Sequence, residues 1–385
     1  MENLKDIKKE PMEGMDYESE VVALTKKLIE FNTINPPGNE MEIARYTGGL
    51  LEDYGFEVSY IPYQEGRIHV VATMKGTQDL DPVIFTGHFD TVPLGQQAWK
   101  MEPLKASVHE GKLYGRGSTD MKGAVAAMIV AAKWAVKQGP PKRSVKFILT
   151  ADEELGCNGA LDLVQRLPQS EKAYGIIVGE PTNNIPAIGH KGGIYLKLKT
   201  SGVTAHSSMP EQGDNAIYKM ARAITQIENF IMEQERDPLL GLTTLNVGYC
   251  QGGMNLNSVP DKAEFTIDAR TTTKMDHDKL LDNIQKTVGE EITIETLVNL
   301  KAIASEESQA FVQQVYKICG FPTENPRAMP YLTDGSVLQA FYRGIPTIII
   351  GPGDPKMAHK TDEYCQVDKL YQAVEIYRDI MISEQ

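Results

Sequence analysis

The segment Gly87-His88-Phe89-Asp90-Thr91-Val92-Pro93 holds a histidine and an aspartate two residues apart. It follows the apolar run Val83 to Phe85, which predicts a buried strand, and side chains two residues apart leave a strand on the same side. A metal-binding histidine needs an acceptor for its other ring N–H, and a nearby carboxylate can supply one. The spacing predicts that His88 binds a metal and Asp90 orients it. Alone, the pair would be a solvated loop pair, so the prediction requires further ligands.

Further candidates follow other predicted strands or precede a helix. Short β-branched runs end at Thr150, Val178 and Ile350, and acidic residues or a histidine follow each of them. Another acid, Asp120, stands just before an apolar helix. The candidate set holds two histidines and four carboxylates, which are His88, Asp120, Glu153, Glu154, Glu180 and His359.

This set predicts a centre with two divalent metals. Crowding so many carboxylates without cations would raise their pKa values at large cost, and two metals neutralise them. A bridging carboxylate holds such metals about 3.5–4 Å apart. Nitrogen and oxygen ligands without thiolate suit zinc, with cobalt and manganese as alternatives. One carboxylate must stay uncoordinated to take a proton from water, and the Glu153-Glu154 pair offers one of each kind.

Simpler interpretations exist for the acidic residues. Most Glu-Glu pairs are exposed acidic surface, but the strand before Glu153 and the Leu155-Gly156 sequence after Glu154 favour a site. Asp120 could cap the helix that follows it, a role that is compatible with metal binding.

The elements expected to position these residues alternate between strands and helices over the first half of the chain. Alternation of this kind predicts an α/β fold with a mostly parallel sheet and helices on both faces. In such sheets functional groups collect at the carboxyl ends of the strands. The expected helices are 17–31, 40–54, 124–136, 309–318 and 336–342, and the expected strands are 68–74, 83–85, 145–150, 175–178 and 347–350.

The pattern changes after Pro186, which predicts an inserted domain. Alternating strands at 194–199, 243–249, 263–269 and 292–297 and helices at 214–232 and 276–288 predict an antiparallel sheet with helices on one face. We therefore expect a catalytic domain formed by residues 1–183 and 300–385, and an inserted α+β lid and dimerisation domain formed by 184–299.

Composition sets the class of protein and of partner. The chain has 385 residues, of which 41% are hydrophobic and 24% charged, so two domains are expected. A net charge of −13, from 39 basic and 52 acidic residues, argues against nucleic acid or an anionic membrane as partner. The apolar stretch 124–136 is too short to span a bilayer and contains Lys133. Four scattered cysteines without a C-x-x-C pair and a charged start without a secretory signal predict a cytoplasmic protein.

Seven segments resemble, in order, the motifs of the dinuclear zinc family of acetylornithine deacetylase, succinyl-diaminopimelate desuccinylase, aminoacylase and glutamate carboxypeptidase. The resemblance covers nearly the whole chain. The segments are GHFDTVP, GRGSTDMKG, ADEELG, VGEPT, TAHSSMPEQGDNAI, NSVPDKAEFTIDAR and GPGDPKMAHKTDEY.

The resemblance implies a role for each matching residue. It places His88 and Glu180 on one metal, Glu154 and His359 on the other, and Asp120 between them, with a cis peptide between Asp120 and Met121. It makes Glu153 the general base and Asp90 the support of His88. It also implies that His206 stabilises the oxyanion, that Arg270 and Asn257 hold the substrate carboxylate, and that the inserted domain forms a homodimer.

Alternatives remain open at several of these positions. On sequence alone, His206 is more simply a surface loop residue, and Arg270 could pair with Asp268 or Glu264 on the sheet. His69 is a departure, because many relatives carry an asparagine there. His69 is nevertheless expected to be structural or solvated, as are the other histidines His190, His109 and His277.

The implied activity is removal of the acyl group from an N-acyl amino acid by a metal-bridged hydroxide, with Glu153 as general base. A carboxypeptidase or dipeptidase acting on short peptides could use the same centre. A dinuclear phosphoesterase is disfavoured by Arg270 and by the absence of a phosphate-cradling glycine loop. A non-catalytic binding protein would be expected to lack Glu153 or a ligand, and none is missing.

Overall fold

The computed structural model describes residues 16–383, which form two compact units. The first runs to Gly189 and includes Ser305–Arg327 and the chain from Thr333 onward, and the second comprises His190–Ala304 and Ala328–Leu332. The sequence-based boundaries, after residues 183 and 299, lie a few residues before these. Within residues 16–383, no helix combines the length and apolarity needed to cross a membrane.

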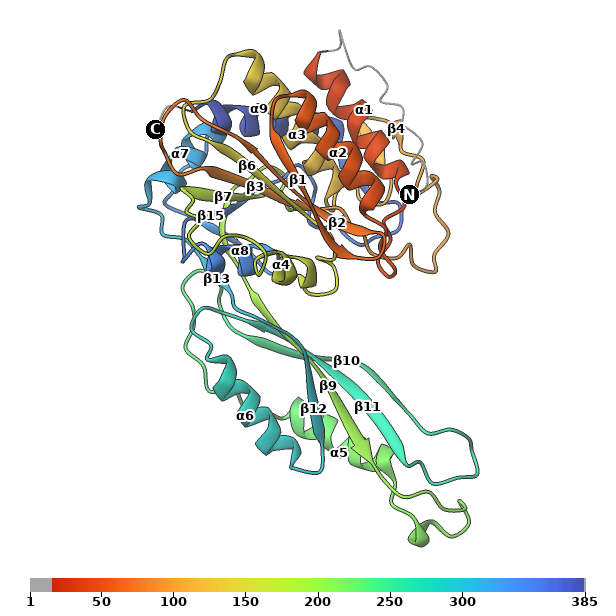
Figure 1. Ribbon diagram of the computed structural model, residues 1–385. Helices are drawn as coiled ribbons and strands as arrows, with labels where there is room; N and C mark the ends of the chain where they lie inside the picture. Colours follow the sequence, from red (N-terminus) through yellow and green to blue (C-terminus); the bar gives the residue numbers. More distant parts are fainter. Residues whose placement is uncertain (1–15, 384–385) are drawn as a thin grey trace. The chain divides into compact units, whose positions relative to one another are not determined.

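A twisted mixed sheet forms the middle of the first unit (Figure 1). Its central strands β6, β3, β7 and β15 are parallel, while β1 and β2 on one side and β8 on the other are antiparallel to their neighbours. The strands in sheet order are β1 (Glu57–Gln64), β2 (Arg67–Met74), β6 (Val145–Thr150), β3 (Val83–His88), β7 (Gly175–Val178), β15 (Thr347–Ile349) and β8 (Ala187–His190).

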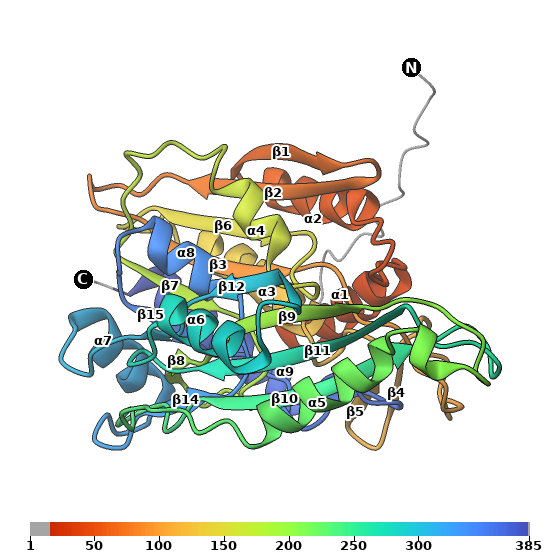
Figure 2. The same cartoon turned by 90° about the horizontal axis from the view of Figure 1, so that it is seen from below.

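Helices cover both faces of this sheet, as Figures 1 and 2 show. On one face α3 packs between α1 and α9, and α2 lies against β1 and β2. On the other face α4 contacts α8, and α8 contacts β7. These helices are α1 (Tyr17–Glu30), α2 (Met41–Asp53), α3 (Lys122–Lys137), α9 (Val367–Ile382), α4 (Asn158–Leu163) and α8 (Gly335–Phe341), and α7 (Ala310–Cys319) contacts α9.

Helix α3 is the buried element that fixes the position of Asp120. Every residue from Lys122 to Ala132 is buried, as expected for a helix that is apolar all round. The one charged residue of that stretch, Lys122, donates from Nζ to the carbonyl oxygen of Phe31 at 2.8 Å. The loop before α3 is therefore anchored at a fixed depth beside the sheet.

A small three-stranded sheet, in the order β16-β5-β4, also belongs to the first unit. It joins the segment before Asp120 to the segment after His359, because β5 pairs with β16. Its strands are β4 (Ser107–His109), β5 (Lys112–Tyr114) and β16 (Tyr364–Gln366); two further short strands of the chain are β13 (Ile303–Ala304) and β14 (Arg327–Met329).

The second unit is an antiparallel sheet in the order β10-β11-β9-β12, with α5 and α6 on one face (Figure 1). Alternating inward side chains of β9 and β11 pack on the apolar faces of the two helices, with Phe265 and Ile284 fully buried. Its elements are β9 (Gly192–Ser201), the short 3-10 helix η1 (Pro210–Gln212), α5 (Ala216–Glu228), β10 (Thr244–Gly252), β11 (Lys262–Thr271), α6 (His277–Val288) and β12 (Thr293–Leu300).

The predicted fold class is confirmed, with the parallel strands confined to the middle of the large sheet. All the helices expected from the sequence are present within a few residues of their predicted ends. Elements that were not expected from the sequence include β1, α4, the C-terminal helix α9 and several short strands, β8 among them. The expected cis peptide between Asp120 and Met121 is confirmed.

Candidate metal centre

The expected ligands of the first unit meet at one edge of its sheet. His88 is the last residue of β3 and pairs with Thr150 at the end of β6, so Glu153 and Glu154 follow at the same level. Strand β7 ends beside β3, and Glu180 follows it. Because these strands are parallel, their carboxyl ends bring side chains from distant parts of the chain together.

Five of the six side chains, all but Glu153, form two groups that share Asp120. His88 Nε2 lies 3.1 Å from Oδ1 of Asp120 and 3.4 Å from Oε1 of Glu180. His359 Nε2 lies 3.3 Å from Oδ2 of Asp120 and 3.1 Å from Oε2 of Glu154. Each oxygen of Asp120 therefore faces a different histidine, and the grouping is the one that the resemblance implies.

Charge is tightly coupled across these groups. Burial alone would lower the pKa of His88, but hydrogen bonds to Asp120, Asp90 and Glu180 raise it well above its usual value. Hydrogen bonds to Asp120 and Glu154 raise the pKa of His359. Without metals, the histidines are therefore protonated, and their positive charges compensate the negative charges of the neighbouring carboxylates.

The carboxyl groups around the histidines have raised pKa values, so their charged forms are disfavoured. Burial, reinforced by the charge of Asp120, raises the pKa of Glu180 to about 8 and also raises that of Glu154. Burial, with Glu180, Asp334 and Glu154 close by, raises the pKa of Glu153 well above its ordinary value. These carboxyls are therefore poorly compensated by the protein itself.

A pair of divalent cations fits this donor set. One oxygen of Glu154, Oε1, is buried without a hydrogen-bond partner among residues 16–383, although the other oxygen contacts His359. His88, Asp120 and Glu154 offer ligand atoms that all lie within 4.8 Å of one another, as do His88, Glu153 and Glu180. Nitrogen and carboxylate oxygen donors, two histidines included, suit zinc or a similar cation.

Asp90 ties the ligand histidine to the Glu153-Glu154 turn. Its carboxylate accepts the backbone N–H of Glu153 and that of Glu154, each at 3.1 Å, and the side-chain amide of Asn35 at 2.8 Å. His88 Nδ1 lies 3.6 Å from this carboxylate but only 2.9 Å from the backbone oxygen of Asp90. The backbone carbonyl is thus the nearer acceptor, and the carboxylate acts mainly on the turn.

The turn itself contains a residue that the sequence analysis did not single out. Asp152 has a φ of 61°, which is left-handed and uncommon for a non-glycine residue. Its carboxylate accepts from Asn35 at 2.6 Å and from the Tyr63 hydroxyl at 2.6 Å, and it pairs with Arg67 at 3.2 Å. Several contacts therefore hold this backbone conformation in place.

His69, the noted departure, lies under the same turn. It is fully buried, and its Nδ1 accepts the backbone N–H of Ala151 at 3.1 Å. Burial lowers the pKa of His69 to about 4, so the imidazole is neutral. The expectation that it is structural agrees with this position, as does the burial of His190 and His277.

Two further residues near Glu153 had no sequence signal. The Cys157 thiol lies 3.5 Å from Oε1 of Glu153, and Asp334, at the start of α8, accepts from the Thr150 hydroxyl at 2.6 Å. Burial raises the pKa of Asp334 to about 6. Cys157 belongs to the same turn, four residues after Glu153, whereas only the fold brings Asp334 beside the base.

His206 and Asn257, in the second unit, lie on adjacent loops. The backbone N–H of Ser207 donates to the carbonyl oxygen of Asn257 at 3.0 Å, and His206 forms a bridge with Ser258. Both side chains are exposed, and the His206 ring is 2.8 Å from the Ser208 hydroxyl.

Arg270 lies at the far end of β11 from those loops. Its guanidinium pairs with both carboxylate oxygens of Asp268, at 2.8 and 3.1 Å, and lies over the ring of Tyr195. Of the two alternatives that the sequence left open, the partner is therefore Asp268. Arg270 remains partly exposed, with 30% of the side chain accessible.

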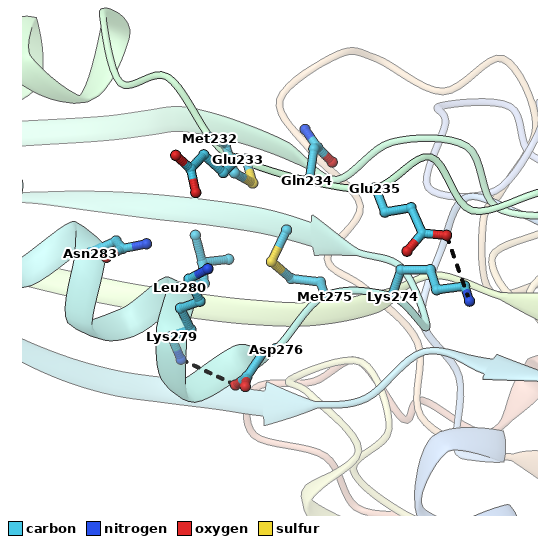
Figure 3. A pocket seen from close by; sticks show the side chains of 10 residues that line it. All are labelled: Met232, Glu233, Gln234, Glu235, Lys274, Met275, Asp276, Lys279, Leu280 and Asn283. Carbon is cyan, nitrogen blue, oxygen red and sulfur yellow. Dashed lines mark hydrogen bonds and ion pairs between the residues drawn. The ribbon is translucent and has the colours of Figure 1, made fainter.

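The second unit also contains a pocket of about 320 Å³ between the segment 232–235 and α6 (Figure 3). Acidic and basic side chains both line it, and Glu235 faces Lys274 at 3.8 Å. No histidine, no cysteine and none of the predicted site residues line it. The pocket therefore shares no residue with the cluster of histidines and carboxylates.

Comparison with known proteins gives a consistent set of relatives. Residues 84–383 match the model of peptidase family M20/M25/M40. A probable succinyl-diaminopimelate desuccinylase of Staphylococcus epidermidis is 28% identical over 94% of this chain and 97% of its own length. Acetylornithine deacetylase of Vibrio vulnificus is 30% identical over 85% and 87%. The crystal structure of an M20 family metallo-carboxypeptidase from Sulfolobus solfataricus matches 95% of this chain and 99% of its own, with a TM-score of 0.80 and 18% identity.

Proposed function

This chain belongs to peptidase family M20/M25/M40 and is a hydrolase of amide bonds, and on that premise we propose that it removes the acyl group from an N-acyl amino acid. The proposed substrates are of the acetylornithine or succinyl-diaminopimelate type. The curated relatives with those names match nearly the full length of the chain. The observation that carries the proposal is a carboxylate between two histidines, with Glu153 beside them.

Five residues would hold the two cations, for which we propose Zn²⁺, with Co²⁺ or Mn²⁺ as substitutes. His88 and Glu180 would hold one cation, Glu154 and His359 the other, and Asp120 would contribute to both. When bound, the cations supply Lewis-acid polarisation of the amide carbonyl and lower the pKa of water in the site. Asp90 fixes the position of His88 relative to the Glu153-Glu154 turn, because it accepts hydrogen bonds from both.

Glu153 acts as the proton carrier in this proposal. It takes a proton from the attacking water and delivers it to the leaving nitrogen, so that a carboxylate and a free amine result. Burial beside other acids favours its protonated form, which suits a group that must return the proton. His206 donates a hydrogen bond to the developing oxyanion, and Arg270 with Asn257 holds the carboxylate of the amino acid.

The second unit supports the idea that two copies of the chain build each site. Lys262 and Arg270 are eight positions apart on one strand, a distance of roughly 27 Å at about 3.4 Å per residue. The pairing of β9 with β11 continues beyond Lys262 towards His206, since Gly202 bonds to Asp261 and Val259 to Ala205. One small substrate cannot reach both Arg270 and His206 of a single chain. A homodimer through the inserted unit would resolve this.

A carboxypeptidase or dipeptidase that uses the same centre is the alternative. It is favoured by the similarity to the metallo-carboxypeptidase, which shows a shared fold. Both activities need a free carboxylate on the substrate, so Arg270 does not separate them. We also propose a cytoplasmic location, which agrees with four free cysteines among the described residues.

The test is a kinetic screen of the purified protein loaded with Zn²⁺ or Co²⁺. Substrates are N-acetylornithine, N-succinyl-diaminopimelate, other N-acyl amino acids and a set of dipeptides, with Glu153→Gln as the inactive control. The expected result is the highest kcat/KM on an N-acyl amino acid. Faster cleavage of dipeptides would favour the alternative, and no amide hydrolysis on any of them would overturn both.

A further inference from the structure

We infer that the buried pair Arg116–Glu363 is the device that sets the spacing of the metal ligands, so that both are positioning residues for the centre. The inference rests on the proposed function, because it assigns these residues a role only if the cluster binds two cations. Neither side chain belongs to the predicted ligand set. Arg116 is 1% exposed and Glu363 is fully buried, and Arg116 is among the largest fully buried side chains of residues 16–383.

Glu363 holds the loop that carries Asp120. Its Oε1 accepts the backbone N–H of Thr119 at 2.8 Å and that of Asp120 itself at 3.1 Å. Its Oε2 accepts the backbone N–H of Gly117 at 3.0 Å. Three backbone N–H groups of this loop therefore donate to one carboxylate, and one of them belongs to Asp120, the residue that lies between the two histidines.

The same residue belongs to the loop that carries His359. Glu363 comes four positions after His359, and its backbone oxygen accepts the N–H of Gly115 at 3.0 Å. The Thr119 hydroxyl donates to the carbonyl oxygen of Tyr364 at 2.7 Å. The two loops thus contact each other on both sides of the Glu363 carboxylate, which fixes the distance between Asp120 and His359.

Arg116 extends the connection to the third ligand loop. Its Nη1 donates to Oε2 of Glu363 at 2.6 Å and to the carbonyl oxygen of Lys360 at 3.3 Å. Its Nη2 donates to the carbonyl oxygen of Pro93, in the segment that follows His88, at 3.0 Å. A planar guanidinium can bind these three acceptors at once, whereas a lysine ammonium is a single point of charge.

The arrangement is more than a buried ion pair that stabilises the fold. A buried pair is weak support for stability, since desolvation offsets much of the attraction. Here the hydrogen bonds of the two side chains all go to loops that supply a proposed ligand: 88–93, 116–120 and 359–363. Groups that orient ligands in this way typically change metal affinity by about 10- to 100-fold when they are mutated.

The experiment compares Glu363→Gln and Arg116→Lys with the matched control Glu20→Gln. Glu20 is also fully buried and pairs with a cation, Lys133, and with the Trp134 N–H, but it joins α1 to α3 and touches no ligand loop. Zn²⁺ and Co²⁺ are titrated into each metal-free protein against a chelating indicator, which gives the stoichiometry and the dissociation constants. The Tm of each metal-free protein is measured separately.

The expected result is a 10- to 100-fold weaker affinity for at least one of two cations in Glu363→Gln. A smaller loss is expected in Arg116→Lys, which keeps the charge and therefore the fold. Glu20→Gln should lower the Tm and leave both affinities unchanged. Unchanged affinities in folded Arg116→Lys and Glu363→Gln overturn the inference, as do equal losses in the control. A wild-type protein that binds fewer than two cations overturns the proposed function instead.

Discussion

Most candidate residues of the first unit are held in the opposite way to those of the second, and His359, with 54% of its side chain exposed, is the exception. In the first unit, His88, Asp120 and Glu180 are buried, and each faces at least one other charged residue of the cluster. In the second unit, His206 and Asn257 are exposed. His206 and Arg270 find their partners two residues away in the chain, Ser208 and Asp268.

The difference agrees with the roles that we propose for the two sets of residues. Carboxylates that are to bind cations are costly to bury alone, so they are stable only inside a network that positions them in advance. Groups that recognise a substrate can stay in water and exchange a local partner for the ligand at little cost. The first unit is thus preorganised, whereas the second supplies adaptable contacts. The predictions below test this contrast, from the largest expected effect to the smallest.

Glu153→Gln should abolish most turnover while the protein still binds two cations. Loss of a general base is worth about 10²- to 10⁴-fold in kcat. Glu154→Gln is the matched comparison, because this neighbour contacts His359 and should lose cation affinity as well as activity. Elemental analysis and kcat on the same samples check it, and near-normal turnover in Glu153→Gln would remove the assignment of the base.

His206→Ala should lower kcat by about 10²- to 10³-fold, as expected for loss of an oxyanion donor, without changing cation affinity or Tm. The exposed His109 provides the control, since its alanine variant should behave like wild type. Mixing Glu153→Gln chains with His206→Ala chains then tests whether the histidine is donated across a dimer. Hybrids should regain one intact site, and hybrids that form but remain inactive would contradict donation between chains.

The metal-free protein should lose stability as the pH rises from about 6 to above 8. The pKa values of His88 and His359 are raised by folding, so their favourable charges are fully present below the unfolded value of about 6.5 and are lost as the pH rises through the folded values. Glu180, with a pKa of about 8, stays protonated in the fold where the unfolded chain is ionised, which acts in the same direction.

Metal binding should therefore stabilise the protein more at higher pH. Each site adds about 2.7 kcal/mol when the cation exceeds its Kd a hundredfold. Thermal unfolding with and without Zn²⁺ between pH 6 and pH 9 measures the difference in Tm. A metal-free Tm that rises over this range would show that the histidines do not compensate the acids as described.

Ser208→Ala should have the smallest effect. The Ser208 hydroxyl and backbone N–H both contact Nδ1 of His206, so the substitution removes the hydroxyl contact and leaves the backbone one. A change in kcat of less than about 10-fold is expected, with stability within about 0.5 kcal/mol, as is usual for exposed positions. A loss as large as that of His206→Ala would mean that the second unit is also preorganised.

Part of the cluster of proposed ligands could be predicted from the sequence because His88 ends a strand and Glu154 and Glu180 closely follow strands, whereas Asp120 precedes helix α3 and His359 lies well beyond the end of β15. Because the carboxyl ends of parallel strands lie at one edge of the sheet, His88, Glu154 and Glu180 must lie close together, and the strand pattern of the sequence is sufficient to predict this. The C-terminal helix α9 was missed although its apolar spacing is regular. Strand β1 is only half-buried, and it carries few fully buried side chains that would have marked its period.

The supporting residues could not be predicted in the same way. Glu363 accepts hydrogen bonds from backbone N–H groups of a loop that is distant in the chain. Because nearly every residue type has a backbone N–H, the sequence of that loop does not indicate the contact. Asn35 and Asp152 meet only because their segments converge beneath the sheet edge. The role of Arg270 could not be predicted for a different reason. An arginine that pairs with Asp268 and an arginine that binds a substrate carboxylate have the same appearance in the sequence.

The order in which the ligands occur along the chain has a consequence for biosynthesis. His88, Asp120, Glu154 and Glu180 emerge from the ribosome before the second unit, whereas His359 and Glu363 emerge after it. Chains grow from the N-terminus and domains tend to fold as they appear. Until the C-terminal segment is synthesised, the acids of the nascent first unit therefore lack the His359 partner, and the loop before α3 lacks its hydrogen bonds to Glu363. A chain truncated before residue 359 should bind cations weakly, and full affinity should mark the completed protein.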